Sequence, residues 1–289
     1  MPPRLIALRR MSLRRRSFRI SSTLVLALLT MAVVACTGGG ETGDDGGQAA
    51  APDTDAPRDA TSASNYDPAI LDDIGRNEDD RYRDGGFKPL EVYGFFGVEP
   101  GMTVVDLSTS GMYNAHILAQ IVGPEGKVIA TTTYRDISRR GSVERTQGIL
   151  ARRNISGVLS NVEIVATLED IPDNSIDMLI TVRNYHDLGP SEDRSAAVTR
   201  LLRVLKPGGI LGAIDADSNK TDERDESVHR INEDMARREI EDGGFLFLGN
   251  SELLYNPQDT FDFDGRDPGD PIHRYYIQRW VLKFRKPPN

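Results

Sequence analysis

The chain has 289 residues, of which 38% are hydrophobic, 27% are charged and 7% are aromatic, and its formal net charge is −9. This composition is typical of a globular domain with extra sequence. It excludes a collagen, a coiled coil, a wholly disordered chain and a multi-span membrane protein. The first 35 residues contain seven arginines and no acidic residue, so the rest of the chain is more acidic than the total indicates. An acidic surface repels phosphate backbones, and we therefore expect no nucleic-acid partner.

Residues 1–35 have the layout of a secretory signal peptide. A basic stretch precedes an apolar run from Leu24 to Ala35, which is too short to span a bilayer comfortably. The tetrapeptide VVAC that ends at Cys36 resembles the bacterial lipoprotein box, and Cys36 is the chain's single cysteine. We expect a lipid anchor at Cys36 and a domain that faces the periplasm. Because Thr37 follows instead of aspartate, we expect the outer membrane. The alternative is a plain secretory leader.

Residues 37–65 contain almost no large apolar side chain and are rich in Gly, Ala, Asp and Pro. Such a segment cannot bury enough surface to fold. The expected organisation is a signal peptide over 1–35, the lipidated cysteine with a flexible linker over 36–65, and one folded domain over 66–289.

Short β-rich runs alternate with helical periods from Tyr66 onward. We expect strands at 102–107, 127–132, 161–166, 175–182, 210–215, 245–255 and 274–284, and helices near 113–121, 196–205 and 223–242. Strands separated by helices indicate βαβ units and a mostly parallel sheet. No helical pattern separates the last two strands, so the last one is expected to run antiparallel. The predicted fold class is α/β, with a seven-stranded, Rossmann-like sheet.

Four segments follow one another at the spacing of class I S-adenosylmethionine-dependent methyltransferases. They are Val104–Leu107, Val162–Val165, Asp173–Asp177 and Leu205–Gly209. The chain also resembles a bacterial, often exported, group of this superfamily in residues 100–107, 183–188 and 281–287. The resemblance covers about residues 67–287. It implies the class I methyltransferase fold, S-adenosylmethionine as cofactor, and transfer of a methyl group to a small-molecule acceptor that the sequence does not identify.

The resemblance also implies a cofactor site, and the chain departs from the family's pattern there. The implied cofactor-binding residues are Asp106, Ser108, Ser110, Gly111, Thr132, Thr167 and Asn184. Serines stand at two positions where glycine is usual. Thr132 and Thr167 replace the acids that usually bind ribose and adenine, and Glu169 and Asp170 are the nearest acids on the adenine side. Because a neutral hydrogen bond is weaker than a charged one, we expect weakened cofactor binding.

Tyr185, His186 and Asp187 follow the fourth strand, at the sheet edge where ligands bind in such folds. His186 has a side chain suited to general-base catalysis, Asp187 can orient it, and Tyr185 can stack on or hydrogen-bond an acceptor. The alternative is that His186 and Asp187 cap a turn while Tyr185 packs in the core. The sequence has no paired Cys/His signature, and no metal site is expected.

Three further features of the sequence have a structural interpretation. Phe87, Phe95 and Phe96 are expected to cover the sheet as a lid, and His116 is expected to be a packing or surface residue. Residues 259–270 are acidic but lack the register of a calcium loop, so an acidic surface loop is expected.

Two classes of function stay open from the sequence. The first is an envelope-displayed methyltransferase. The second is a non-catalytic envelope binding protein that has kept the fold and lost the cofactor, which the departures at the cofactor site favour. S-adenosylmethionine is made in the cytoplasm, and this also favours the second reading. In a third interpretation, the pocket holds another small molecule of the envelope.

Overall fold

The computed structural model describes residues 65–132, 141–188, 193–221, 224–265 and 277–288. The predicted signal peptide, Cys36 and the linker up to residue 64 lie outside these ranges, so those assignments stay predictions. No helix in the described part of the chain is long and apolar enough to cross a membrane.

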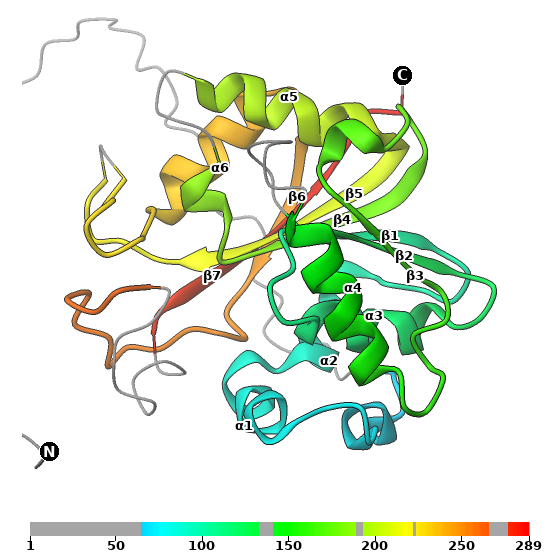
Figure 1. Ribbon diagram of the computed structural model, residues 1–289. Helices are drawn as coiled ribbons and strands as arrows, with labels where there is room; N and C mark the ends of the chain where they lie inside the picture. The colour runs from blue at the N-terminus through cyan, green and yellow to red at the C-terminus, as the bar shows by residue number, and fades with distance from the viewer. Residues whose placement is uncertain (1–64, 133–140, 189–192, 222–223, 266–276, 289) are drawn as a thin grey trace, which may run out of the picture. The chain divides into compact units, whose positions relative to one another are not determined.

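A seven-stranded sheet forms the centre of the domain, in the order β3-β2-β1-β4-β5-β7-β6 (Figure 1). The strands are β1 (Thr103–Leu107), β2 (Lys127–Thr131), β3 (Val162–Val165), β4 (Ile176–Val182), β5 (Leu205–Ala216), β6 (Leu246–Ser251) and β7 (Arg279–Arg285). The first five strands pair in parallel, whereas β7 runs antiparallel to both β5 and β6. The predicted α/β fold and its antiparallel last strand are confirmed. The structure adds that β7 inserts between β5 and β6.

Helices cover both faces of this sheet. The α-helices are α1 (Glu78–Phe87), α2 (Pro89–Phe96), α3 (Tyr113–Val122), α4 (Gly141–Arg153), α5 (Arg194–Val204) and α6 (Glu233–Asp242), with 3-10 turns η1 (Pro68–Asp72), η3 (Leu168–Asp170) and η4 (Tyr185–Asp187). Successive strand residues point to opposite faces. Accordingly, Val105 belongs to the core beneath α5 and α6, and Val104 to the core beneath α2 and α3. Figure 1 shows α5 and α6 on one side of the sheet and α2, α3 and α4 on the other.

Helix α2 packs closely against the sheet through Phe96, which is fully buried. A Cβ atom at Gly212 of β5 would lie 2.6 Å from the Phe96 ring, so this approach requires glycine. Phe95 packs beside Phe96, with ring centroids 5.7 Å apart. These two aromatic residues therefore cover the sheet as expected, whereas Phe87 has a different position, described below.

Helix α6 is shorter than the sequence pattern predicts. It begins at Glu233, because the Asn232 side chain accepts hydrogen bonds from the backbone N–H groups of Asp234 and Met235 and so caps the helix. Residues 224–232 are instead irregular and are tied down by Arg230, which is 1% exposed.

The guanidinium of Arg230 pairs with Asp259 at 2.8 and 3.1 Å. Asp259 also accepts a hydrogen bond from the backbone N–H of Gln278, at 2.7 Å. The first residue of the predicted acidic surface loop is therefore a buried structural anchor. This corrects the prediction for Asp259, and residues 266–270 of that loop lie outside the described residues.

Candidate functional site

The carboxyl ends of β1 and β4 meet at the centre of the sheet. The chain continues from β1 toward β2 on one side, while β4 and β5 follow on the other, so the strand order reverses at this point. Ligands in open α/β sheets bind in the crevice at such a reversal. Asn184 joins the two strand ends, since its side-chain amide donates hydrogen bonds to the carbonyl oxygens of Leu107 (3.2 Å) and Val182 (2.8 Å).

The loop after β1 has a backbone shape that usually requires glycine. Ser108 and Met112 have φ values of 60° and 66°, in the left-handed region that side chains disfavour. Thr131 at the end of β2 holds this loop. Its hydroxyl accepts a hydrogen bond from the N–H of Ser108 (2.7 Å), and its carbonyl accepts one from the N–H of Thr109 (2.8 Å). The serine-containing loop thus keeps a glycine-type conformation through two specific bonds.

A cavity of about 390 Å³ opens over this loop, within the range of small-molecule sites. It is lined by Arg83, Phe87, Ser108, Thr109, Ser110, Gly111, Tyr113, Asn114, Val182, Arg183 and Asn184. A Cβ atom built on Gly111 meets no atom within 4 Å, so the backbone at this position faces open space.

A buried carboxylate, Asp106, lies beneath the cavity floor and is 1% exposed. Its Oδ1 accepts a hydrogen bond from the side-chain amide of Asn114 (3.3 Å), and the Tyr93 hydroxyl in turn donates to Oδ1 of Asn114 (2.9 Å). Its Oδ2 has no hydrogen-bond partner among the described residues. Burial raises the pKa of Asp106 to about 6, against the opposing effect of polar contacts from Thr109, Asn114 and Ala115.

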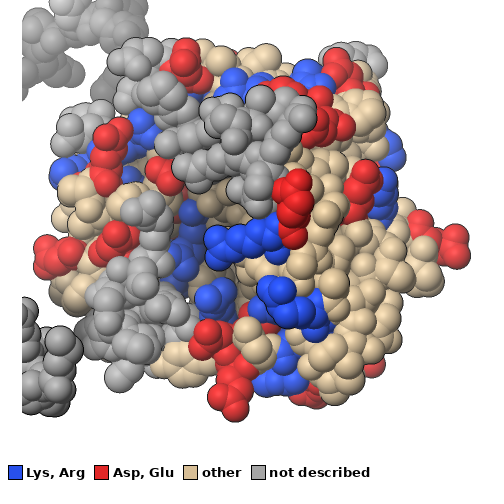
Figure 2. Space-filling model, in the orientation of Figure 1, with Lys and Arg blue, Asp and Glu red and all other residues tan. Residues whose placement is uncertain are grey.

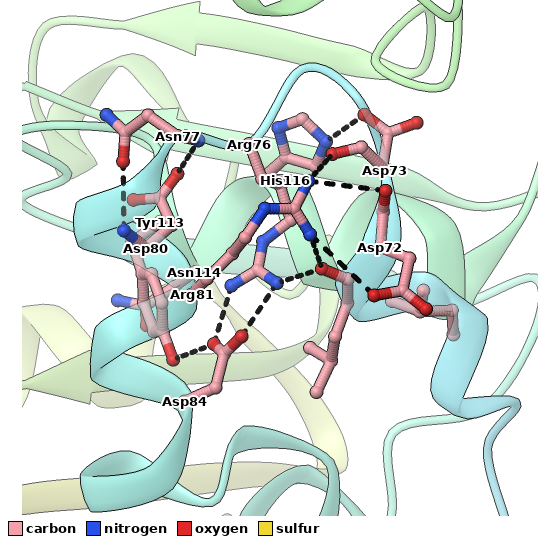
Figure 3. A network of polar contacts seen from close by, with 12 residues as sticks. Asp72, Asp73, Arg76, Asn77, Asp80, Arg81, Asp84, Tyr113, Asn114 and His116 are labelled. Carbon is pink, nitrogen blue, oxygen red and sulfur yellow. Dashed lines mark hydrogen bonds and ion pairs between the residues drawn. The ribbon is translucent and has the colours of Figure 1, made fainter.

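A network of polar contacts, the N-terminal clamp, holds helix α1 in place (Figure 3). Asp84 accepts hydrogen bonds from the Arg76 guanidinium at 2.6 and 2.9 Å and from the Tyr113 hydroxyl at 2.8 Å. Arg153 of α4 pairs with Asp80 of the same helix. These contacts present the α1 residues Arg83 and Phe87 to the cavity.

His116 takes part in the same polar network. Its Nε2 lies 2.8 Å from an Asp73 carboxylate oxygen, and its side chain is fully buried. Burial lowers the pKa of His116, with the Arg153 and Arg76 charges acting in the same direction and Asp73 opposing them. The packing role expected from the sequence is therefore confirmed.

Tyr185 lies outside the cavity lining. It is 0% exposed in the core that contains Trp280, whose ring centroid is 6.1 Å away. Its hydroxyl donates a hydrogen bond to Glu239 of α6 (3.1 Å), and the Arg194 guanidinium lies 4.9 Å from the centroid of its ring. This position is that of a core residue. The catalytic assignment of Tyr185 stays a prediction.

His186 also does not line the cavity, but it has the arrangement of a histidine–aspartate pair. Its Nδ1 lies 2.9 and 3.0 Å from the two carboxylate oxygens of Asp215 at the end of β5. Its Nε2 forms no hydrogen bond to any described residue, and Asp187 is 3.7 Å from it. His229 stacks edge-on at 5.7 Å. Asp215, not Asp187, is thus the closer partner of His186.

The two threonines expected at the nucleoside end are engaged in local structure. The Thr132 hydroxyl donates to the carbonyl oxygen of Ala166 at 3.3 Å. The Thr167 hydroxyl caps η3 by accepting from the N–H of Glu169 (3.2 Å), and the Asp170 carboxylate accepts from the N–H groups of Ala166 and Thr167. Neither threonine lines the cavity.

Comparisons with solved structures address the fold. A SAM dependent methyltransferase from Aquifex aeolicus aligns with a TM-score of 0.52 and 21% identity, over 76% of this chain and 98% of that chain. The [4+2]-cyclase SpnF aligns with a TM-score of 0.50 and 17% identity, over 73% of this chain and 81% of that chain. At these identities the likeness shows the fold alone, and the cyclase illustrates that this fold supports more than one reaction.

Comparisons at the sequence level indicate a methyltransferase domain. Residues 118–213 match the model of a methyltransferase domain. The ubiquinone/menaquinone biosynthesis C-methyltransferase UbiE of Shewanella woodyi is 30% identical over 127 residues, which cover 44% of this chain and 47% of that protein. Over this part of its length the chain is similar to class I S-adenosylmethionine-dependent methyltransferases. It spans about half the length of the curated relatives that it matches.

This similarity implies S-adenosylmethionine as the cofactor, and the residues present fit its methionine end. Gly111 leaves open space, the serine loop offers hydroxyl groups, and the buried Asp106 has a carboxylate oxygen without a partner among the described residues. Of the residues predicted to bind the cofactor, Ser108, Ser110, Gly111 and Asn184 line the cavity, and Asp106 lies below it. The match to the domain model begins at residue 118, after the β1 loop. The loop that precedes the match contains Ser108 and Ser110, the two serines that stand where glycine is usual.

Several residues that line the cavity were not predicted from the sequence. They are Arg83, Phe87, Thr109, Tyr113, Asn114, Val182 and Arg183. Arg183 had a detectable signal, because it directly follows the fourth predicted strand. Arg83 had none, since its place in the cavity depends on where α1 packs.

Among the described residues, no group of three or more His, Cys, Asp or Glu side chains is arranged to hold a metal ion.

Proposed function

We propose that this chain is an S-adenosylmethionine-dependent methyltransferase for a small-molecule acceptor, displayed as a lipoprotein that faces the periplasm, at the outer membrane. The observation that carries the enzymatic part is the cavity at the β1/β4 reversal, whose loop keeps a glycine-type backbone at Ser108. Two non-local bonds from Thr131 hold that backbone. The lipoprotein part rests on the sequence around Cys36.

When bound, the cofactor supplies an electrophilic methyl group on a sulfonium. The residues that would hold it are Ser108, Ser110, Gly111 and Asn184 around the cavity, with Asp106 below as the negative counterpart of its ammonium group. Phe87 and Val182 would provide apolar lining beside the bound cofactor.

A proton on the acceptor nucleophile requires a base. Of the predicted trio, His186 would be that base for an acceptor that extends beyond the cavity lining, because hydrogen bonding of its Nδ1–H to Asp215 leaves the lone pair on Nε2. Asp215 would fix the orientation of the imidazole, as a positioning residue. Tyr185 would hold this turn in place from the core through its hydrogen bond to Glu239, and Asp187 lies 3.7 Å from Nε2 of His186.

A second candidate function is a binding protein that no longer uses this cofactor. The observation in its favour is that the Thr132 and Thr167 hydroxyls are engaged in local hydrogen bonds. The ribose and adenine positions therefore lack the carboxylates that would contribute the stronger, charged hydrogen bonds.

Calorimetric titration of the full chain in mild detergent with S-adenosylhomocysteine separates these functions. A methyltransferase should bind it with a micromolar dissociation constant. The variant Gly111→Val places a side chain in the open space and should abolish the binding heat without lowering the melting temperature, because no atom lies within 4 Å of the new Cβ. The matched control Gly85→Val, at an exposed α1 position with equally open space, should bind normally. Absence of heat and of any thermal shift at millimolar ligand would favour the binding protein.

A further inference from the structure

A chain of hydrogen bonds leads from helix α2 to the Asp106 carboxylate beneath the cavity. The Tyr93 hydroxyl donates to Oδ1 of Asn114 at 2.9 Å, and the Asn114 side-chain amide donates to Oδ1 of Asp106 at 3.3 Å. Tyr93 is 2% exposed, and of these three residues only Asn114 lines the cavity. The Tyr93 hydroxyl is therefore in a position to act on a bound ligand through Asn114 and Asp106.

The Tyr93 hydroxyl has a fixed role as the donor at one end of this chain. Burial raises the pKa of Tyr93 well above its usual value, and the charges of Asp106 and Asp84 raise it further against the opposing charge of Arg76. The hydroxyl is thus protonated at neutral pH. Its position is also fixed, because the backbone carbonyl of Tyr93 accepts a hydrogen bond from the Tyr66 hydroxyl at 3.2 Å.

This donor decides which way the Asn114 side chain is turned. An asparagine can present either its oxygen or its nitrogen to a neighbour, so the partners on both sides select the orientation. Tyr93 occupies the Asn114 oxygen, which leaves the amide N–H to face Asp106. A donor that faces a carboxyl group favours its charged form. The reverse orientation would place the Asn114 oxygen against Asp106 and would favour the protonated acid.

Asp106 depends on this support because burial disfavours its charge. Figure 2 shows carboxylates at the surface of the molecule, where water stabilises them, whereas Asp106 is 1% exposed. Burial raises its pKa to about 6, with Thr109, Asn114 and Ala115 opposing the effect. Asp106 is therefore ionised at pH 7, but its pKa lies only about one pH unit below neutrality. Loss of one supporting hydrogen bond would use up most of that margin.

We propose that Tyr93 and Asn114 are positioning residues that keep Asp106 charged beneath the cavity, where it attracts the ammonium group of the cofactor; this rests on the methyltransferase function proposed above. Without the Tyr93 hydroxyl, the Asn114 amide is free to turn its oxygen toward Asp106. A larger fraction of the molecules then has Asp106 protonated. The neutral acid no longer attracts an ammonium group, so the affinity for the amino-acid end of the cofactor falls.

Calorimetry of the full chain in mild detergent with two ligands tests this proposal. S-adenosylhomocysteine has the ammonium group, whereas 5′-methylthioadenosine keeps the nucleoside and the sulfur atom but lacks the amino-acid end. At pH 6, Tyr93→Phe should weaken S-adenosylhomocysteine about fivefold, as expected if the pKa of Asp106 rises by about one pH unit. The affinity for 5′-methylthioadenosine should stay within about twofold. At pH 8.5 Asp106 is ionised in both chains, and the loss should disappear.

Three further variants separate this role from a loss of packing. Tyr66→Phe is the matched control, because it removes a hydroxyl that donates only to the backbone carbonyls of Tyr93 and Val98 among its printed contacts, and it should leave both affinities unchanged. Asn114→Ala removes the donor itself and should give the same pH dependence as Tyr93→Phe. In the Asp106→Asn background, Tyr93→Phe should weaken S-adenosylhomocysteine no further, because the group through which it acts is gone.

A second measurement requires no ligand. In a chain labelled with ¹³C at the aspartate carboxyl carbons, the Asp106 signal is assigned by its loss in Asp106→Asn. The midpoint of its NMR titration should rise by about one pH unit in Tyr93→Phe and should not change in Tyr66→Phe.

The proposal is overturned if the Asp106 midpoint is the same in Tyr93→Phe and in the parent chain, and this outcome leaves the methyltransferase function intact where the nucleosides still bind. It is also overturned if the effects of Tyr93→Phe and Asp106→Asn on S-adenosylhomocysteine add, or if Tyr93→Phe weakens both ligands equally, since the hydroxyl would then only support the shape of the cavity. A raised midpoint in a parent chain that binds neither nucleoside would instead remove the methyltransferase function, and with it the role toward the cofactor.

Discussion

Asp106 is a residue whose position lowers the stability of the fold. Its carboxylate is 1% exposed, and burial raises its pKa from 3.8 to about 6. Below about pH 3 the carboxyl is neutral in both the folded and the unfolded chain. Between pH 4 and 6 the unfolded chain ionises first, so the free energy of unfolding falls as pH rises, and above pH 6 the cost is complete. A shift of this size corresponds to about 3 kcal/mol at most.

Replacing Asp106 by asparagine should therefore separate stability from binding. At pH 8, Asp106→Asn should raise the free energy of unfolding in urea by about 1–3 kcal/mol, and the gain should shrink as the pH falls from 6 to 4. The same variant should weaken S-adenosylhomocysteine binding, because the negative charge below the cavity is lost. The exposed Asp79→Asn serves as control and should change neither quantity. A loss of stability at pH 8 would mean that the Asp106 carboxylate is a structural acceptor.

Helix α1 is the element that completes the cavity, and a small number of polar contacts hold it. Asp84 is central, because it accepts from both Arg76 and Tyr113. The Arg76 side chain is 0% exposed, so breaking this pair leaves a buried charge without its partner, a change that is strongly destabilising in general. The clamp therefore couples the position of Arg83 and Phe87 to buried electrostatics.

The variant Asp84→Asn should loosen α1 more than the rest of the domain. We expect faster hydrogen exchange at α1 amides and at least tenfold weaker S-adenosylhomocysteine binding, while the amides of the central strands keep their protection. Asp79→Asn, in the first turn of the same helix, is the matched control. If exchange rises equally throughout the sheet, the clamp supports the whole fold and is not specific to the cavity wall.

The turn after β4 is a second element with two distinct sides. Arg183, with φ 56°, and Asn184 face the cavity, whereas Tyr185 enters the core under α6 and His186 pairs with Asp215. The left-handed residue at the strand end redirects the chain within a few positions. Neighbours in sequence consequently serve different sites.

Tyr185→Phe and His186→Asn should leave the S-adenosylhomocysteine affinity within about twofold, as measured by calorimetry, because neither side chain lines the cavity. Tyr185→Phe should cost about 1.5–3 kcal/mol of stability, since it removes a hydrogen bond to the charged Glu239. A large loss of nucleoside affinity in either variant would show that the cofactor site extends across this turn.

At the scale of the whole molecule, the proposed location depends on Cys36. The chain's single cysteine ends the apolar run of the predicted signal peptide. Lipidation there would attach the domain to the membrane through the linker predicted over residues 36–65. In bacterial cells, Cys36→Ser should move the protein from the membrane fraction to the soluble fraction and remove the label from a fed fatty-acid analogue. Equal membrane retention of Cys36→Ser and the parent chain would contradict the lipoprotein assignment.

The pattern of short apolar runs and helical periods in the sequence determined the α/β class and most strands of the sheet. Val104, Val105 and Leu107 form β1 as predicted, because a strand that is buried on both faces of a parallel sheet leaves a short apolar run in the sequence. The resemblance also placed Ser108, Gly111 and Asn184 at one sheet edge, since they follow strands that are adjacent in this fold. The start of α6 was wrong, because the Asn232 cap and buried Arg230 overrode a charged helical pattern.

Only the tertiary structure decided which side chains share the cavity. Arg83 and Phe87 belong to it because buried pairs between α1, α3 and α4 fix the position of a helix that precedes the sheet. The structure likewise paired His186 with Asp215 on a neighbouring strand and sent Tyr185 into the core. Local periodicity is recorded in consecutive residues and can be read from them. Which distant residues come into contact depends on packing and on buried charge. No short segment of the sequence records that information.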